Sequence, residues 1–204
     1  HEGEEALVLD AFRAQREAQS DALLVLVPRH PERFNEVHTR CVEGGWSVVR
    51  RSSVADVTQA TDILLVDSIG ELMMFYGLAD VAVIGGSFSE AGGAPRGGHN
   101  PLEPAAWGKP ILAGTSMFNF EQIAAQLVAA GALEQCSGAR ELAQCLVNLC
   151  GSEAERARRG AAAQSVVESN RGALEALFGE VRRAALPELA ADSVPATQPD
   201  QAAD

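Results

Sequence analysis

Lysine is almost absent from this chain of 204 residues: Lys109 is the only one, and the other basic residues are arginines. Acidic residues are abundant, and the formal net charge is −12. Nucleic acids and anionic membrane surfaces carry the same sign of charge, so non-specific binding to either is disfavoured. We therefore expect no nucleic-acid partner.

Long hydrophobic runs and cysteine motifs are also missing. No stretch approaches the roughly 18 apolar residues of a membrane helix, and no signal peptide opens the sequence. The four cysteines show no CxxC spacing and the four histidines are scattered, so we expect free thiols and neither a metal nor another cofactor. The sequence begins with His1 rather than Met, and we interpret it as a soluble part of a longer protein.

Several common motifs of enzymes are absent as well. The sequence has no GxxxxGK[ST] loop, no HExxH, no GxSxG and no GxGxxG at a first strand–helix unit. These absences exclude the usual signatures of P-loop nucleotidases, zinc peptidases and serine hydrolases. A nucleotide site, if there is one, must be built differently.

Apolar periodicity predicts strands that alternate with helices. We expect strands at 23–27, 46–49, 63–66, 81–84 and 110–113, and helices at 4–19, 31–43, 69–76, 101–107, 120–130, 139–149, 153–169 and 172–184. This order is typical of an α/β fold, with a Rossmann-like parallel sheet and helices on both faces. We predict one domain over residues 1–186 and a disordered acidic tail over 187–204, which has prolines and no basic residue.

Three loops that follow expected strands carry polar residues suited to binding. In a parallel α/β sheet, ligands bind beyond the carboxyl ends of the strands, so these loops predict a single site. The first loop offers Arg29, His30 and Arg33 beside a helix start, which suits an anion. The alternative is a solvated, positively charged turn.

The other two loops offer both capping groups and possible ligand contacts. Ser68 and Glu71 have capping-box spacing for the helix at 69–76, and a capping pair is compatible with ligand contact. The third loop contains His99, Asn100 and Glu103 after a glycine-rich run. Asn100 stands at an expected N-cap, His99 could simply bind backbone, and the Glu103 carboxylate could accept hydrogen bonds from two ribose hydroxyls.

Together, the segments PRHPERF, VDSIGEL, GLADVAVIGGSF and GGHNPLEPAAWGKPIL, followed by FNF, resemble the C-terminal half of the Kdo (3-deoxy-D-manno-octulosonic acid) transferases of lipopolysaccharide synthesis. The resemblance covers about residues 1–135. It implies half of a GT-B fold, which consists of two Rossmann-like domains facing across a cleft. It also implies an inverting glycosyltransferase that transfers Kdo from CMP-Kdo to a lipid A precursor at the cytoplasmic face of the bacterial inner membrane.

Carried over to this chain, the resemblance implies a donor site for CMP-Kdo. Its implied and predicted members are Arg29, His30, Arg33, Ser68, Gly70, Glu71, Gly86, Ser87, Gly98, His99, Asn100 and Glu103. The family's general base, acceptor site and membrane anchor lie in its N-terminal half, so we expect no catalytic residue here and no activity of this part alone. The segment 89–96 departs from the family, in which the link between GGSF and GGHN is usually very short.

Two alternatives remain open at this point. One is a domain of another GT-B enzyme that uses a UDP-sugar. The other is a non-catalytic interaction module whose glycine-rich loop binds a protein partner.

Overall fold

The computed structural model describes residues 3–89 and 96–185, with side chains through residue 171. The chain divides into two units, His1–Val167 and Glu168–Asp204. The predicted tail at 187–204 lies outside the described residues. No helix in the described part of the chain is long and apolar enough to cross a membrane.

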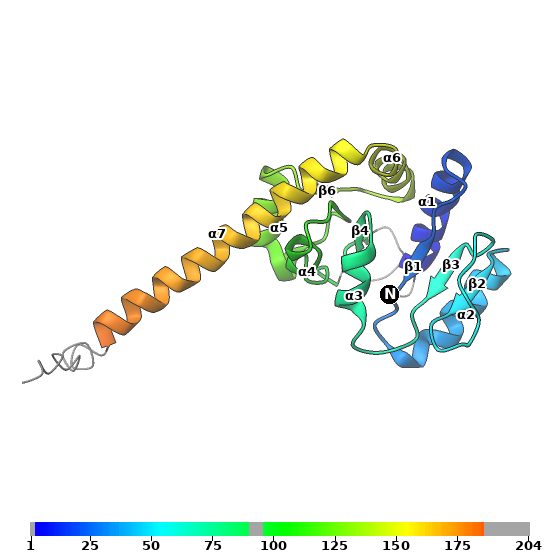
Figure 1. The fold of residues 1–204 in the computed structure, drawn as a ribbon, viewed down its shortest axis with the longest axis horizontal. Coiled ribbons are helices and arrows are strands. Elements are labelled where there is room, and N and C mark those ends of the chain that lie inside the picture. Colours follow the sequence, from blue (N-terminus) through cyan, green and yellow to red (C-terminus); the bar gives the residue numbers. More distant parts are fainter. Residues whose placement is uncertain (1–2, 90–95, 186–204) are drawn as a thin grey trace, which may run out of the picture. The chain divides into compact units, whose positions relative to one another are not determined.

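Strands and helices alternate along the larger unit (Figure 1). The strands are β1 (Leu24–Leu26), β2 (Val48–Arg50), β3 (Ile63–Leu65), β4 (Ala82–Ile84), β5 (Ile111–Ala113) and β6 (Leu133–Gln135). The helices are α1 (Glu4–Ala18), α2 (Phe34–Glu43), α3 (Leu72–Leu78), α4 (Leu102–Ala106), α5 (Glu121–Ala129), α6 (Ala139–Cys150) and α7 (Glu153–Ala185), with short 3-10 helices η1 (Pro31–Arg33) and η3 (Phe118–Phe120).

All strand pairings are parallel, and the strands form two sheets of three. The first has the order β1-β3-β2 and the second the order β4-β5-β6. Parallel neighbours need a crossover, which α4 supplies between β4 and β5 and α5 supplies between β5 and β6. The predicted class, α/β with parallel strands and flanking helices, is confirmed, although the strands fall into two sheets rather than one.

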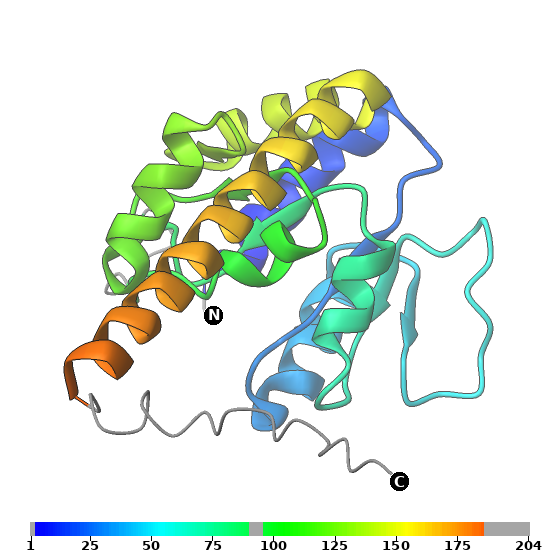
Figure 2. The ribbon, with the colours of Figure 1, turned by 60° about the vertical axis from the view of Figure 1, so that its left-hand side comes forward.

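Helix α1 packs against the cores of both sheets. Leu9 and Phe12 join the cluster around β3, whereas Leu7 and Ala11 join the cluster around β5 and α6. The helix therefore presents apolar side chains on two faces, and Figure 2 shows it from a second side. Glu4 and Glu5 in the first turn of α1 are buried as well, with exposed fractions of 6% and 4%.

The structure differs from the predicted elements in three places. Residues 133–135 form β6, which the pattern did not predict, because LEQ has one apolar residue and becomes a strand only by pairing with β5. The two helices predicted at 153–169 and 172–184 form one helix, α7, since Gly172 does not end it. The helix predicted from residue 69 begins at Leu72, because the backbone of Gly70 is left-handed.

Candidate functional site

The first and third predicted loops meet at the ends of β1 and β4. The Arg29 guanidinium nitrogen Nη1 lies 3.4 Å from Nδ1 of His99, although 70 residues separate the two in the sequence. Arginine can only donate, so Nδ1 of His99 acts as the acceptor and its Nε2 carries the proton. Burial, and then the charge of Arg29, lower the pKa of His99, which keeps its imidazole neutral at pH 7.

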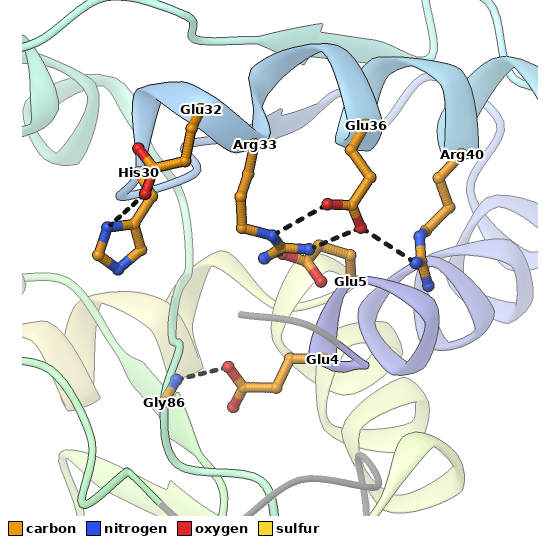
Figure 3. A network of polar contacts seen from close by, with 8 residues as sticks. All are labelled: Glu4, Glu5, His30, Glu32, Arg33, Glu36, Arg40 and Gly86. Atoms are coloured by element: carbon orange, nitrogen blue, oxygen red, sulfur yellow. Dashed lines mark hydrogen bonds and ion pairs between the residues drawn. The ribbon is translucent and has the colours of Figure 1, made fainter.

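Arg33 from the first loop is held by two carboxylates (Figure 3). Its guanidinium lies 2.6 Å from Glu5 Oε1 and 3.1 Å from Glu36 Oε1. This pairing compensates the charge of Arg33 and ties the start of α2 to the first turn of α1. Of the first-loop cations, Arg29 is exposed and stands beside His99, and it is better placed to meet an anionic ligand.

The ion pair of Glu5 predicts a dependence of stability on pH. Burial alone would raise the pKa of Glu5, but the hydrogen bond from Arg33 and several smaller favourable interactions together outweigh it, so the pKa is lowered from 4.5. The stabilisation is therefore present above pH 4.5 and is lost as the pH falls through the folded-state pKa. Between about pH 5 and pH 3, we expect the free energy of unfolding of the native protein to fall more steeply than that of Glu5→Gln.

Urea denaturation at a series of pH values measures this difference in slope. Glu17→Gln is the matched control, because Glu17 is an exposed carboxylate on the same helix, and it should keep the native slope. Equal slopes for Glu5→Gln and the native protein would contradict the role given to the ion pair.

The second loop does not form the capping box that its spacing predicts. Gly70 has a φ of 89°, in the left-handed region, so a right-handed helix cannot begin at residue 69. Helix α3 starts two residues after Gly70, with Glu71 at the N-cap and no side-chain capping bond. The Ser68 hydroxyl instead donates to the Glu71 carboxylate, which also accepts a hydrogen bond of 2.9 Å from Arg51.

Backbone hydrogen bonds connect residues at the two ends of the third loop. The N–H of Gly98 donates to Gly86 O at 2.9 Å, and that of His99 donates to Gly85 O at 3.1 Å. Gly98 must be glycine here, because its φ is 73° and a β-carbon would lie 2.3 Å from the Met117 sulfur. Two backbone hydrogen bonds therefore join Gly85 and Gly86 to His99 and Gly98.

The side chain of Ser87 is buried and stabilises the fold. Its hydroxyl is fully buried, donates to Ile84 O at 2.6 Å and accepts from the Gly114 N–H at 2.7 Å. These bonds connect the end of β4 to the residue after β5. The predicted contribution of Ser87 to a ligand site can therefore come only through its backbone.

Asn100 and Glu103 lie together at the start of α4. The N-cap position is Pro101 rather than Asn100, but Oδ1 of Asn100 accepts a hydrogen bond of 3.1 Å from the Leu102 N–H. Nδ2 of Asn100 lies 3.4 Å from Glu103 Oε1. Burial, and then the charge of Glu103, raise the pKa of Tyr76 in α3 to about 12, so its hydroxyl stays protonated.

Sequence reasoning did not identify the two acids at the start of α1. Glu4 accepts a hydrogen bond of 2.7 Å from the Gly86 N–H, and Glu5 pairs with Arg33 (Figure 3). Glu4 also accepts a hydrogen bond of 3.0 Å from the Phe88 N–H. Two adjacent acids in the first turn of a helix are an ordinary pattern, because the helix dipole favours them. Only their burial distinguishes Glu4 and Glu5 from ordinary acids at the start of a helix.

A cavity of about 310 Å³ lies beside β2 and α3. Its lining comes from β2, the segment after it, β3 and α3, and includes Arg51 and Phe75 but none of the twelve predicted site residues. No group of three or more His, Cys, Asp or Glu side chains in residues 3–89 and 96–171 is placed to hold a metal ion.

Comparison with known proteins identifies relatives across most of the chain. It is 41% identical over 179 residues to the 3-deoxy-D-manno-octulosonic acid transferase of Haemophilus influenzae, covering 87% of this chain and 41% of that protein. It is 35% identical over 176 residues to the enzyme of the same name from Bordetella pertussis, covering 84% of this chain and 40% of that one. The chain thus spans about two fifths of the length of these relatives.

One solved structure is similar to this chain over most of the length of both. The C-terminal CMP-Kdo binding domain of WaaA from Acinetobacter baumannii matches with a TM-score of 0.75 and 31% identity. The match covers 82% of this chain and 84% of that one. No protein-family model matches the sequence.

Proposed function

The chain belongs to the family of 3-deoxy-D-manno-octulosonic acid (Kdo) transferases, and we propose that it is the part of such a glycosyltransferase that binds the donor, CMP-Kdo. The observation that carries this proposal is the match to a CMP-Kdo binding domain over 84% of that domain. The meeting of Arg29 and His99 between β1 and β4 supports it, because a donor with a phosphodiester and a carboxylate requires such groups.

Within this site we propose separate tasks for the two pairs of residues. Arg29 supplies a positive charge, and His99 supplies a neutral N–H donor at Nε2, for the anionic groups of the donor. Asn100 and Glu103 hold the ribose, since the carboxylate can accept hydrogen bonds from both ribose hydroxyls. His30, Arg33, Ser68, Gly70, Glu71, Gly86, Ser87 and Gly98 shape the loops around them.

For the whole protein we propose transfer of Kdo to a lipid A precursor at the cytoplasmic face of the bacterial inner membrane. This chain spans 41% of the length of the Haemophilus relative. The general base, the acceptor site and the contact with the membrane would belong to the other part. The chain alone would bind the donor without turning it over.

Titration with nucleotides tests the proposal. At ten times its dissociation constant, CMP should stabilise the protein by about 1.4 kcal/mol, measured as a rise in melting temperature. Amide NMR signals of the described glycines, Gly85, Gly86, Gly97 and Gly98, should move in the same titration. UDP is the matched control: a response to UDP without one to CMP would contradict the Kdo assignment, and no response to either would contradict a nucleotide site.

A further inference from the structure

The Glu4 carboxylate is built into the loop that follows β4. Its two oxygens each accept one backbone hydrogen bond, Oε2 from Gly86 N–H at 2.7 Å and Oε1 from Phe88 N–H at 3.0 Å. These bonds are buried and join residues 82 and 84 positions apart. Hydrogen bonds to an ionised acceptor are about twice as strong as neutral ones, so this is a strong link between α1 and the loop.

The same stretch of loop is held from its other side as well. The Gly86 carbonyl accepts from Gly98 N–H at 2.9 Å, and the Gly85 carbonyl accepts from His99 N–H at 3.1 Å. Gly86 therefore has its N–H bound to Glu4 and its C=O bound to Gly98. If the Glu4 carboxylate moved, Gly86 would move with it, and the backbone at positions 98 and 99 would be displaced in turn.

That backbone sets the position of the proposed donor contacts. His99 contacts Arg29, and the next residue, Asn100, contacts Glu103. Because the Gly86 and Phe88 N–H groups are already bound by Glu4, they are not free donors for a phosphate, as a glycine-rich loop would otherwise suggest. Residues 85–88 thus contribute to the proposed donor site through the shape of their backbone.

We propose that Glu4 is a positioning residue of the donor site: its carboxylate fixes the loop at 85–88 and, through it, the residues His99 and Asn100 that meet the donor. This inference rests on the proposed binding of CMP-Kdo. It assigns the buried acid of α1 a part in donor affinity that does not require contact with the donor.

Glu4→Gln tests this assignment, because glutamine keeps the size of the side chain but can offer only one oxygen to the two N–H groups. Because the loop is then held less firmly, we expect the affinity for CMP, measured by calorimetry, to fall by about 10-fold, which corresponds to roughly 1.4 kcal/mol. The amide proton signals of Gly86, Phe88, Gly98 and His99 should also move in the ligand-free protein. Glu17→Gln, on the exposed side of α1, should change neither measurement.

The outcomes separate this inference from the proposed function. A folded Glu4→Gln protein with native affinity would overturn the inference, as would native amide signals at residues 98 and 99. If Glu4→Gln does not fold, Glu4→Asp decides: its shorter side chain keeps the charge but cannot span both N–H groups, so native affinity in that variant would also overturn it. A native protein that does not bind CMP would contradict the proposed function, whereas the effect of Glu4→Gln on the amide signals of 98 and 99 would still test the positioning role.

Discussion

Replacing Glu103 with alanine is expected to weaken CMP binding by about 30-fold and to leave the fold intact. Its carboxylate lies in the first turn of α4 and is partly exposed, with Oε1 3.4 Å from Asn100 Nδ2. A hydrogen bond to a charged group contributes about 1.5–3 kcal/mol, which corresponds to roughly 10- to 150-fold in affinity. Because Oδ1 of Asn100 still accepts from the Leu102 N–H, the start of α4 is not expected to unravel.

Calorimetric titration with CMP measures the loss, and melting temperature checks the fold. Glu121→Ala is the matched control, since Glu121 is an acid in the first turn of α5, as Glu103 is in the first turn of α4, and it is exposed. Its affinity for CMP should be native. If Glu103→Ala unfolds the protein, Glu103 is structural, and if it binds CMP normally, the ribose lies elsewhere.

A large loss of stability is expected from Gly114→Ala. A β-carbon on residue 114 would lie 2.1 Å from the carbonyl oxygen of Ser87 and 2.6 Å from the backbone nitrogen of Phe88. Neither can move easily, because Ser116 N–H donates to that same carbonyl at 3.0 Å and Glu4 holds the Phe88 N–H. We expect a loss of more than about 3 kcal/mol of unfolding free energy, or no folded protein at all.

Urea denaturation quantifies this loss, with Gly151→Ala for comparison. At position 151 the nearest atom to an added β-carbon is the Val147 carbonyl oxygen, at 3.1 Å, so only a small change is expected. A native unfolding midpoint for Gly114→Ala would show that the loop after β4 can retreat from β5. That result would also weaken the view that this loop is rigidly held.

The fold could be predicted wherever the residues of a single segment are enough to indicate its secondary structure. β1, β3, β4 and β5 are short aliphatic runs that are recognisable as buried strands without knowledge of their neighbours. β6 is not, because Leu133 is its one apolar residue and its pairing with β5 decides its conformation. The late start of α3 depends on the left-handed backbone of Gly70, and no helical pattern reveals the sign of φ.

The candidate site was predictable in the same limited sense. The positions of Arg29 and His99 after two strands indicated that they could meet, and the structure brings them to 3.4 Å. The sequence shows that Gly86 offers a backbone N–H, but not that an acid 82 residues away accepts it. Packing of α1 against both cores determines that pairing, and packing depends on the whole chain.

The backbone bonds that join Gly85 and Gly86 to Gly98 and His99 bear on how this family can vary. Once the two ends of a segment are fastened to each other, lengthening it costs only loop entropy, about 0.6 kcal/mol for each doubling. Residues can then be gained or lost between the two glycine pairs over evolutionary time without displacing the groups on either side. A longer link between GGSF and GGHN is therefore compatible with an unchanged arrangement of the proposed donor site on either side of it.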